Sequence, residues 1–244
     1  MKKISKTIEQ ILVDGLRKGY IDFLEELAKR SESMLTSSGW LWTRSNFVDT
    51  AIGKALSENK VGDYEKYTSG AWEFLRFQIP LEDGKNTWIV QKTVNYVYNN
   101  ANFQGTKDQK QNFISDWGNQ VNEKNSKKSS DKLGQIDLFD SSSNIDRAVD
   151  ASEFNNVDSF LLLTYSIAED KNINDIKLNL IYDRKITLIE NLNDINAASD
   201  VKIPDELYSK LNNMKVIDPK EESFDTYDYY SGVNEKKDPK QNKQ

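Results

Sequence analysis

The sequence predicts an α+β protein in which N-terminal helices pack on an antiparallel sheet of two hairpins. Three observations support this fold class: an amphipathic pattern at the N-terminus, an Asp-Gly turn between two apolar runs, and a late pair of apolar runs. We expect one α+β domain over residues 1–217, with a polar insertion at about residues 105–158. Residues 218–244 are polar and nearly free of aliphatic side chains, so we expect a flexible acidic tail there.

Two amphipathic helices are expected before the first strands. Residues 4–30 place apolar side chains such as Ile8 and Leu12 on one helix face, with charged residues outside it. The segment at 33–39 ends this helix. A second helix is expected from about Ser45, and the side chain of Ser45 or of Thr43 can cap its first turn.

The first hairpin is expected within residues 71–98. An Asp-Gly pair flanked by aromatic and β-branched runs is a strong hairpin signal. With Asp83 and Gly84 as the two loop residues, Phe77 lies opposite Val90. In this register one apolar face extends over both strands, and the opposite face is a mixed surface that water or a helix could cover.

The middle of the chain is polar and charged. Trp117 and Val121 lie four positions apart within a stretch rich in Lys, Asn and Gln, and they predict a short helix. Residues 137–158 carry several acids but lack the ligand spacing and central glycine of a calcium loop. We therefore expect a solvated acidic linker there.

A second β unit follows the polar middle. Residues 159–167 form a nearly continuous apolar run, which predicts a buried strand. Residues 176–182 alternate between apolar and polar side chains and are the expected partner strand, with a third strand near Ile186 and Leu188. A short helix is expected to begin at Pro204.

Two absences from the composition restrict the possible chemistry. Among its 244 residues the chain has no histidine and no cysteine, which excludes Ser-His-Asp and Cys-His nucleophiles, zinc fingers and disulfides. A metal would have to be a hard cation held by oxygen atoms, such as magnesium. The net charge of −6 argues against general nucleic-acid binding. No apolar run approaches the length of about 18 residues that suggests a membrane span, so we expect a cytoplasmic protein with no membrane partner.

One pair of residues could carry catalysis. In the expected register Glu73 and Lys92 are diagonal neighbours on one face of the hairpin. This layout resembles that of PD-(D/E)xK nucleases, in which acids hold magnesium beside the lysine. The residue two positions before Lys92 is Val90, so an acid such as Asp49 or Glu65 would have to complete the metal site. A structural ion pair is the favoured interpretation.

Aromatic residues at two places could contact a protein partner. Trp40 and Trp42 lie at the entrance to the second helix and could form a recognition patch or cover the core. The tail combines acids with aromatic residues and could serve as a docking segment or only as a solubilising tail. Its aromatic residues are Phe224, Tyr227, Tyr229 and Tyr230.

Three segments resemble those of a group of uncharacterised proteins from Gram-positive bacteria and their phages. They are the Trp-x-x-x-Asn segment at 42–46, Ser-Gly-Ala-Trp-Glu-Phe-Leu at 69–75, and the strand at 159–167 with its partner strand extending to residue 182. The resemblance implies a similar fold and a mobile-element setting. It implies no activity.

The function favoured by the sequence is that of a non-enzymatic cytoplasmic interaction protein of phage or mobile-element origin. Such a protein would need no cofactor and would modulate a host or competing-element factor by binding a protein partner, in host defence or counter-defence. One alternative is a magnesium-dependent nuclease or toxin that uses Glu73 and Lys92. A second is a DNA-mimic inhibitor, which requires the acids of 137–158 and of the tail to line one face. Direct nucleic-acid binding is not favoured.

Overall fold

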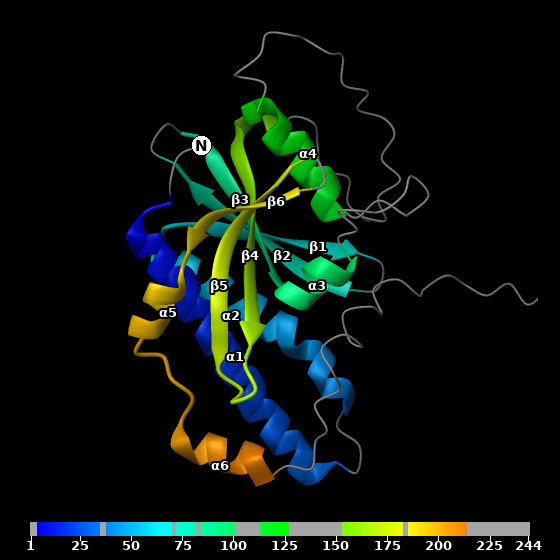
Figure 1. Ribbon diagram of the computed structural model, residues 1–244, viewed down its shortest axis with the longest axis vertical. Helices are drawn as coiled ribbons and strands as arrows, with labels where there is room; N and C mark the ends of the chain where they lie inside the picture. Colours follow the sequence, from blue (N-terminus) through cyan, green and yellow to red (C-terminus); the bar gives the residue numbers. More distant parts are fainter. Residues whose placement is uncertain are drawn as a thin grey trace, which may run out of the picture.

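A computed structural model describes residues 4–34, 38–69, 72–81, 84–100, 113–126, 153–182 and 185–213 of the chain (Figure 1). The helices in chain order are α1 (Lys6–Ser33), η1 (Ser38–Thr43), α2 (Arg44–Glu58), α3 (Val94–Asn100), α4 (Phe113–Ser126), η3 (Glu153–Asn156), α5 (Asn193–Ala198) and α6 (Asp205–Asn213). The strands are β1 (Asp63–Ser69), β2 (Trp72–Pro80), β3 (Asn86–Thr93), β4 (Val157–Ile167), β5 (Ile173–Tyr182) and β6 (Lys185–Asn191). Helices and a sheet in this arrangement confirm the α+β class.

The six strands form one mixed sheet in the order β1-β2-β3-β4-β5-β6. Strands β1 to β3 and strands β4 to β6 are two antiparallel sets, and β3 pairs with β4 in parallel. The expectation of a purely antiparallel sheet is therefore wrong at this one pair. Parallel neighbours require a crossover connection, and the chain between β3 and β4 supplies it with α3 and α4.

The register of the β2–β3 hairpin differs by one residue from the register expected from the sequence. Phe77 lies opposite Ile89. The Leu81 N–H donates to the Lys85 carbonyl at 2.7 Å, so the loop is one residue longer than a two-residue turn. Gly84 is the last loop residue and has a φ of 78°, a conformation that glycine adopts without strain. A slip of one residue moves every side chain of a strand to the other face of the sheet.

The end of β3 and the presence of β1 also differ from expectation. The run of aromatic and β-branched residues up to position 98 was expected to continue as a strand, but α3 begins at Val94. The Thr93 Oγ1 accepts the Tyr96 N–H at 3.2 Å, as an N-cap residue does. Strand β1 carries several charged and polar residues and lies at the edge of the sheet, so its sequence lacks the apolar pattern that predicts strands.

Two hydrophobic cores cover the two faces of the sheet. The first joins α1 and α2 to the face that carries Phe77 and Ile89. The second lies beneath α4, where Trp117 and Val121 pack on the opposite face of the sheet. Helix α4 is the short helix that the spacing of these two residues predicts. The expected polar insertion thus contains a helix that packs on β4 and β5, and its last expected residues already belong to β4, which begins at Val157.

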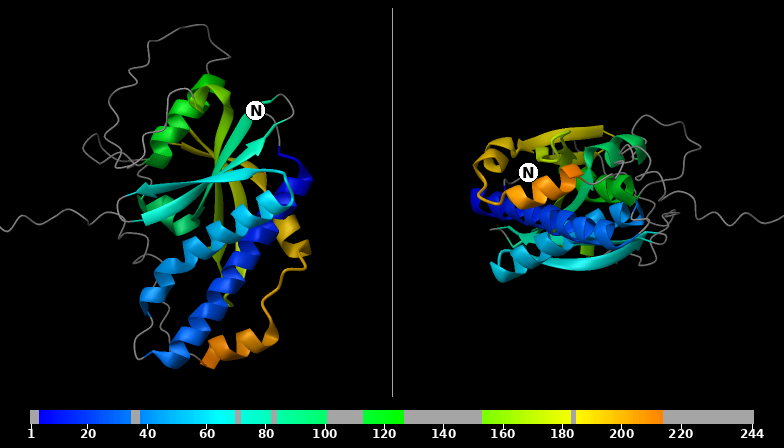
Figure 2. Two further views of the ribbon diagram at one scale, coloured as in Figure 1. Left: turned by 180° about the vertical axis from the view of Figure 1, so that it is seen from behind. Right: turned by 90° about the horizontal axis from the view of Figure 1, so that it is seen from below.

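Helices α1 and α2 lie side by side and approach each other closely (Figure 2). A Cβ at Gly19 would lie 2.6 Å from the Val48 Cα, and one at Gly15 would lie 3.0 Å from the Ile52 Cα. Such distances leave no room for a larger side chain, so the two glycines permit this packing. Both helices agree with the amphipathic pattern of the sequence.

The segment after β6 runs along α1. The Arg17 side chain donates to the Val201 carbonyl and to the Asn196 side chain. Helix α6 begins directly after Pro204, as predicted, and buries Leu207 and Leu211 against the first core. Among the helices described, none is long and apolar enough to cross a membrane. The expected acidic tail lies outside the described residues.

Candidate functional site

The structure does not bring Glu73 and Lys92 together. Glu73 is exposed, and its Oε1 lies 2.9 Å from the Nζ of Lys66 on β1. The Lys92 Nζ lies 4.5 Å from the centre of the Tyr96 ring and 5.7 Å from that of Phe74. Successive side chains of a strand point to opposite faces, so Glu73 lies on the face opposite to Phe74 and Lys92. The hairpin therefore lacks the acid–lysine pair that the expected register contained.

The acids considered as further metal ligands have other roles. Asp49 on α2 is buried, and its Oδ2 accepts the Leu75 N–H at 3.0 Å. Burial raises the pKa of Asp49 to about 7, although this hydrogen bond and the charge of Lys92 oppose the rise. Glu65 on β1 accepts hydrogen bonds from Arg76 and Tyr67 at 2.6 and 2.7 Å. Within the described ranges, no three acidic side chains are grouped so that they could hold a metal ion.

The Arg76 side chain is buried among aromatic rings, which sequence reasoning missed. Its guanidinium carbon lies 3.6 Å from the centre of the Trp88 ring and 4.8 Å from that of Tyr67. The sequence places Arg76 on the mixed face of the hairpin, which water or a helix could cover. Helix α4 covers this face, so the Arg76 side chain is buried. The cation–π contacts and the ion pair with Glu65 give this residue a structural role.

The tryptophans proposed as a recognition patch lie in η1 and are half-buried. Trp40 packs against the first core, and the Arg30 guanidinium carbon lies 4.7 Å from the centre of its ring. Trp40 thus covers core residues, which was the second interpretation of its position. The tail aromatic residues Phe224, Tyr227, Tyr229 and Tyr230 and the acidic stretch at 137–152 lie outside the described residues.

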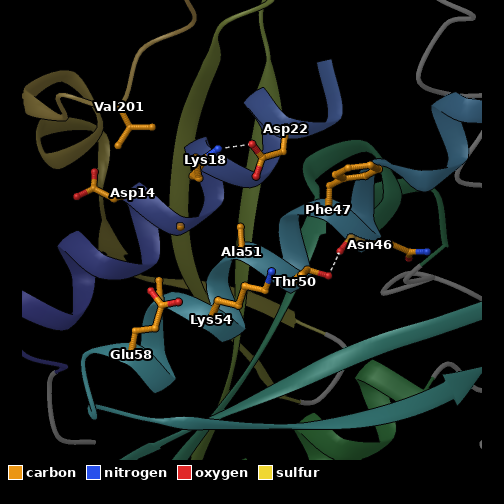
Figure 3. Close-up of a pocket in the computed structure, with 12 residues that line it drawn as sticks. Asp14, Lys18, Asp22, Asn46, Phe47, Thr50, Ala51, Lys54, Glu58 and Val201 are labelled. Carbon is orange, nitrogen blue, oxygen red and sulfur yellow. Dashed lines mark hydrogen bonds and ion pairs between the residues drawn. The ribbon is translucent and has the colours of Figure 1, made fainter. Parts of the chain in front are cut away.

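A surface groove lies between α1 and α2 (Figure 3). Its volume is about 740 Å³, which is within the range of about 300–1,000 Å³ typical of ligand pockets. Its floor consists of small or apolar residues: Gly15 on α1, and Phe47, Ala51 and Ala55 on α2. The small side chains on two neighbouring helices make the surface concave. In the sequence, Gly15 and Gly19 lie four residues apart, as do Ala51 and Ala55. Small residues at this spacing share one helix face and could have indicated the groove.

The rim of this groove carries charges of both signs. On α1, Lys18 forms an ion pair with Asp22, and Asp14 accepts hydrogen bonds from Gln10 and Ser199. On α2, Lys54 and Glu58 are exposed one helical turn apart. Among the described residues, neither of these two side chains has a hydrogen bond or ion pair. Their charges are therefore available to a molecule that binds in the groove.

The structure thus defines an α+β protein with a groove between two of its helices, lined by small, apolar and charged side chains. Comparisons of the chain with models of protein families, with curated proteins and with solved structures give no match.

Proposed function

We propose that this chain is a non-enzymatic interaction protein that binds a protein partner through the groove between α1 and α2. The observation that carries the proposal is the groove itself, with its apolar floor and charged rim. A groove between two helices suits an amphipathic helix, which buries its apolar face on the floor and directs its charged residues to the rim.

The charges of the groove support a protein ligand over a nucleic acid. Lys18 and Lys54 are outnumbered on the rim by Asp14, Asp22 and Glu58. Nucleic-acid binding depends on an accumulation of Lys and Arg opposite the phosphates, and the acids on this rim would repel phosphates. Protein surfaces carry both signs of charge and can be complementary to such a rim.

The cellular setting is also part of the proposal. The resemblance to phage and Gram-positive bacterial proteins supports a cytoplasmic protein of mobile-element origin that modulates a host or competing-element factor. Binding to such a factor requires no cofactor.

Affinity capture from lysate of the native host tests the proposal. Ala51→Arg places a long, charged side chain on the groove floor, whereas Ala197→Arg adds the same side chain at an exposed position on α5. The original chain and Ala197→Arg should capture the same partner, and Ala51→Arg should lose it. Capture that is unchanged by Ala51→Arg would contradict a role for the groove.

The nuclease alternative has its own test. Purified protein is incubated with DNA and RNA in the presence of magnesium, alongside Lys92→Ala. Cleavage by the original chain that is lost in Lys92→Ala would overturn the non-enzymatic proposal. The interactions of Glu73 with Lys66 and of Lys92 with Tyr96 make the absence of cleavage the expected result.

A further inference from the structure

We infer that the partner bound in the groove is a second copy of this chain. In the inferred dimer a two-fold axis relates the two copies, and α2 of each copy packs against the groove of the other. The inference rests on the proposed function, because it names the partner for the same groove.

The exposed charges on α2 are complementary to those of a second, antiparallel copy of the same helix. Lys54 and Glu58 project from this helix one turn apart (Figure 3), and within the described part of the chain no other residue pairs with them. When two copies of α2 lie antiparallel across a two-fold axis, Lys54 of each copy lies next to Glu58 of the other. A single symmetry operation then forms two ion pairs, since every contact of such an interface occurs twice.

The side chains beside these charges are small. Ala51 and Ala55 lie on the floor beside Lys54 and Glu58, and alanine allows two helices to approach closely. Helices pack at axis separations of about 8–10 Å depending on the residues at the contact. When α2 of each copy lies in the groove of the other, the α1–α2 pair of one copy packs on that of its partner, and the four helices form a bundle, which is a common arrangement of amphipathic helices.

The mixed charges on the rim disfavour a partner that carries mostly one sign of charge. A strongly acidic partner would meet Asp14, Asp22 and Glu58, and a strongly basic one would meet Lys18 and Lys54. Each would place like charges against part of the rim, which is unfavourable. A second copy carries the same mixture of charges in the same geometry, so symmetry matches each sign with its opposite at Lys54 and Glu58.

Sedimentation velocity of the full chain, from micromolar to near-millimolar concentration, tests the inference. Lys54→Glu gives a chain with acids at both positions, and Glu58→Lys gives a chain with bases at both. Each variant alone would place like charges across the axis, so its dimer should be at least about tenfold weaker than that of the original chain. An equimolar mixture of the two variants would again place acids opposite bases and should restore dimerisation.

Matched controls separate this result from misfolding and from other interfaces. Both substituted side chains are exposed, and circular dichroism should report an unchanged fold. Lys210→Glu makes the same charge change on α6, away from the groove, and should leave the dimer intact. The inference is overturned if the original chain is monomeric throughout the range, or if the mixture associates no more tightly than its components.

These outcomes also distinguish the inference from the proposed function. A monomeric chain that still captures a different protein, with the capture lost in Ala51→Arg, refutes self-association and leaves the groove as a binding site. A dimer that is unaffected by the charge variants and by Ala51→Arg refutes the inference, because that dimer would form through another surface.

Discussion

The buried carboxyl group of Asp49 makes the stability of the protein depend on pH. Asp49 on α2 is 4% exposed, and the backbone N–H of Leu75 on β2 donates a hydrogen bond to it. Removal of the carboxyl group from water raises its pKa from 3.8 to about 7. Asp49→Asn removes the charge and keeps an oxygen that can accept the Leu75 N–H.

The sign of the effect follows from the two pKa values. Below about pH 4 the carboxyl group is protonated in both the folded and the unfolded chain, so it causes no penalty. As the pH rises, the unfolded chain releases the proton first, and the folded state loses stability until about pH 7, where it too ionises. Above that pH the penalty is constant.

The magnitude follows from the same values. A difference of one pKa unit between two states corresponds to ~1.4 kcal/mol. The rise from 3.8 to about 7 therefore lowers the free energy of unfolding by about 4 kcal/mol at about pH 8.5, and by about 2 kcal/mol at about pH 5.5. The gain from Asp49→Asn should thus be about 2 kcal/mol larger at the higher pH. An effect of the amide group on stability that is the same at both pH values cancels from this difference.

Urea unfolding at the two pH values measures these free energies. Asp200→Asn serves as the control, because Asp200 is exposed and the substitution removes the same charge. A difference between the two pH values that is near zero or of opposite sign for Asp49→Asn would refute the argument from burial. If Asp200→Asn shows an equal difference in the free energy of unfolding between the two pH values, the loss of one negative charge explains the effect and burial does not.

Three further substitutions test the packing of the fold by urea unfolding. Gly19→Ala should lower the free energy of unfolding by about 2 kcal/mol or more, because the added Cβ would lie 2.6 Å from the Val48 Cα. Trp117→Ala should lower it by about 3–5 kcal/mol, because the buried indole packs against the aromatic rings of the second core. Thr93→Ala should cost about 1 kcal/mol, because it removes the hydroxyl group that accepts the Tyr96 N–H at the start of α3.

Two of these substitutions have a matched control variant. A Cβ at Gly39 would meet no atom within 4 Å, so Gly39→Ala should leave stability nearly unchanged. If Gly19→Ala is as stable as Gly39→Ala, the close approach of α1 and α2 is contradicted. Thr93→Ser retains the hydroxyl group and should retain most of the stability, whereas equal losses from the serine and alanine variants would contradict the cap. An exposed Trp117 would instead make Trp117→Ala nearly neutral.

Local patterns in the sequence predicted most of the secondary structure. The apolar faces of α1 and α2, the alternation along β5 and the proline before α6 all depend on residues close together in the chain. Such patterns reflect the periods of the helix and the strand, which the sequence displays directly. The absence of histidine and cysteine restricts the possible chemistry in the same direct way.

The tertiary structure decided which of these elements meet. One additional loop residue before Lys85 moved the register of β3, and with it the face on which Lys92 lies. The parallel pairing of β3 with β4 depends on a long crossover, and the burial of Arg76 depends on α4, which comes from a distant part of the chain. The groove likewise depends on the packing of α1 against α2. These features depend on contacts between residues far apart in sequence, whose register and packing no local period determines.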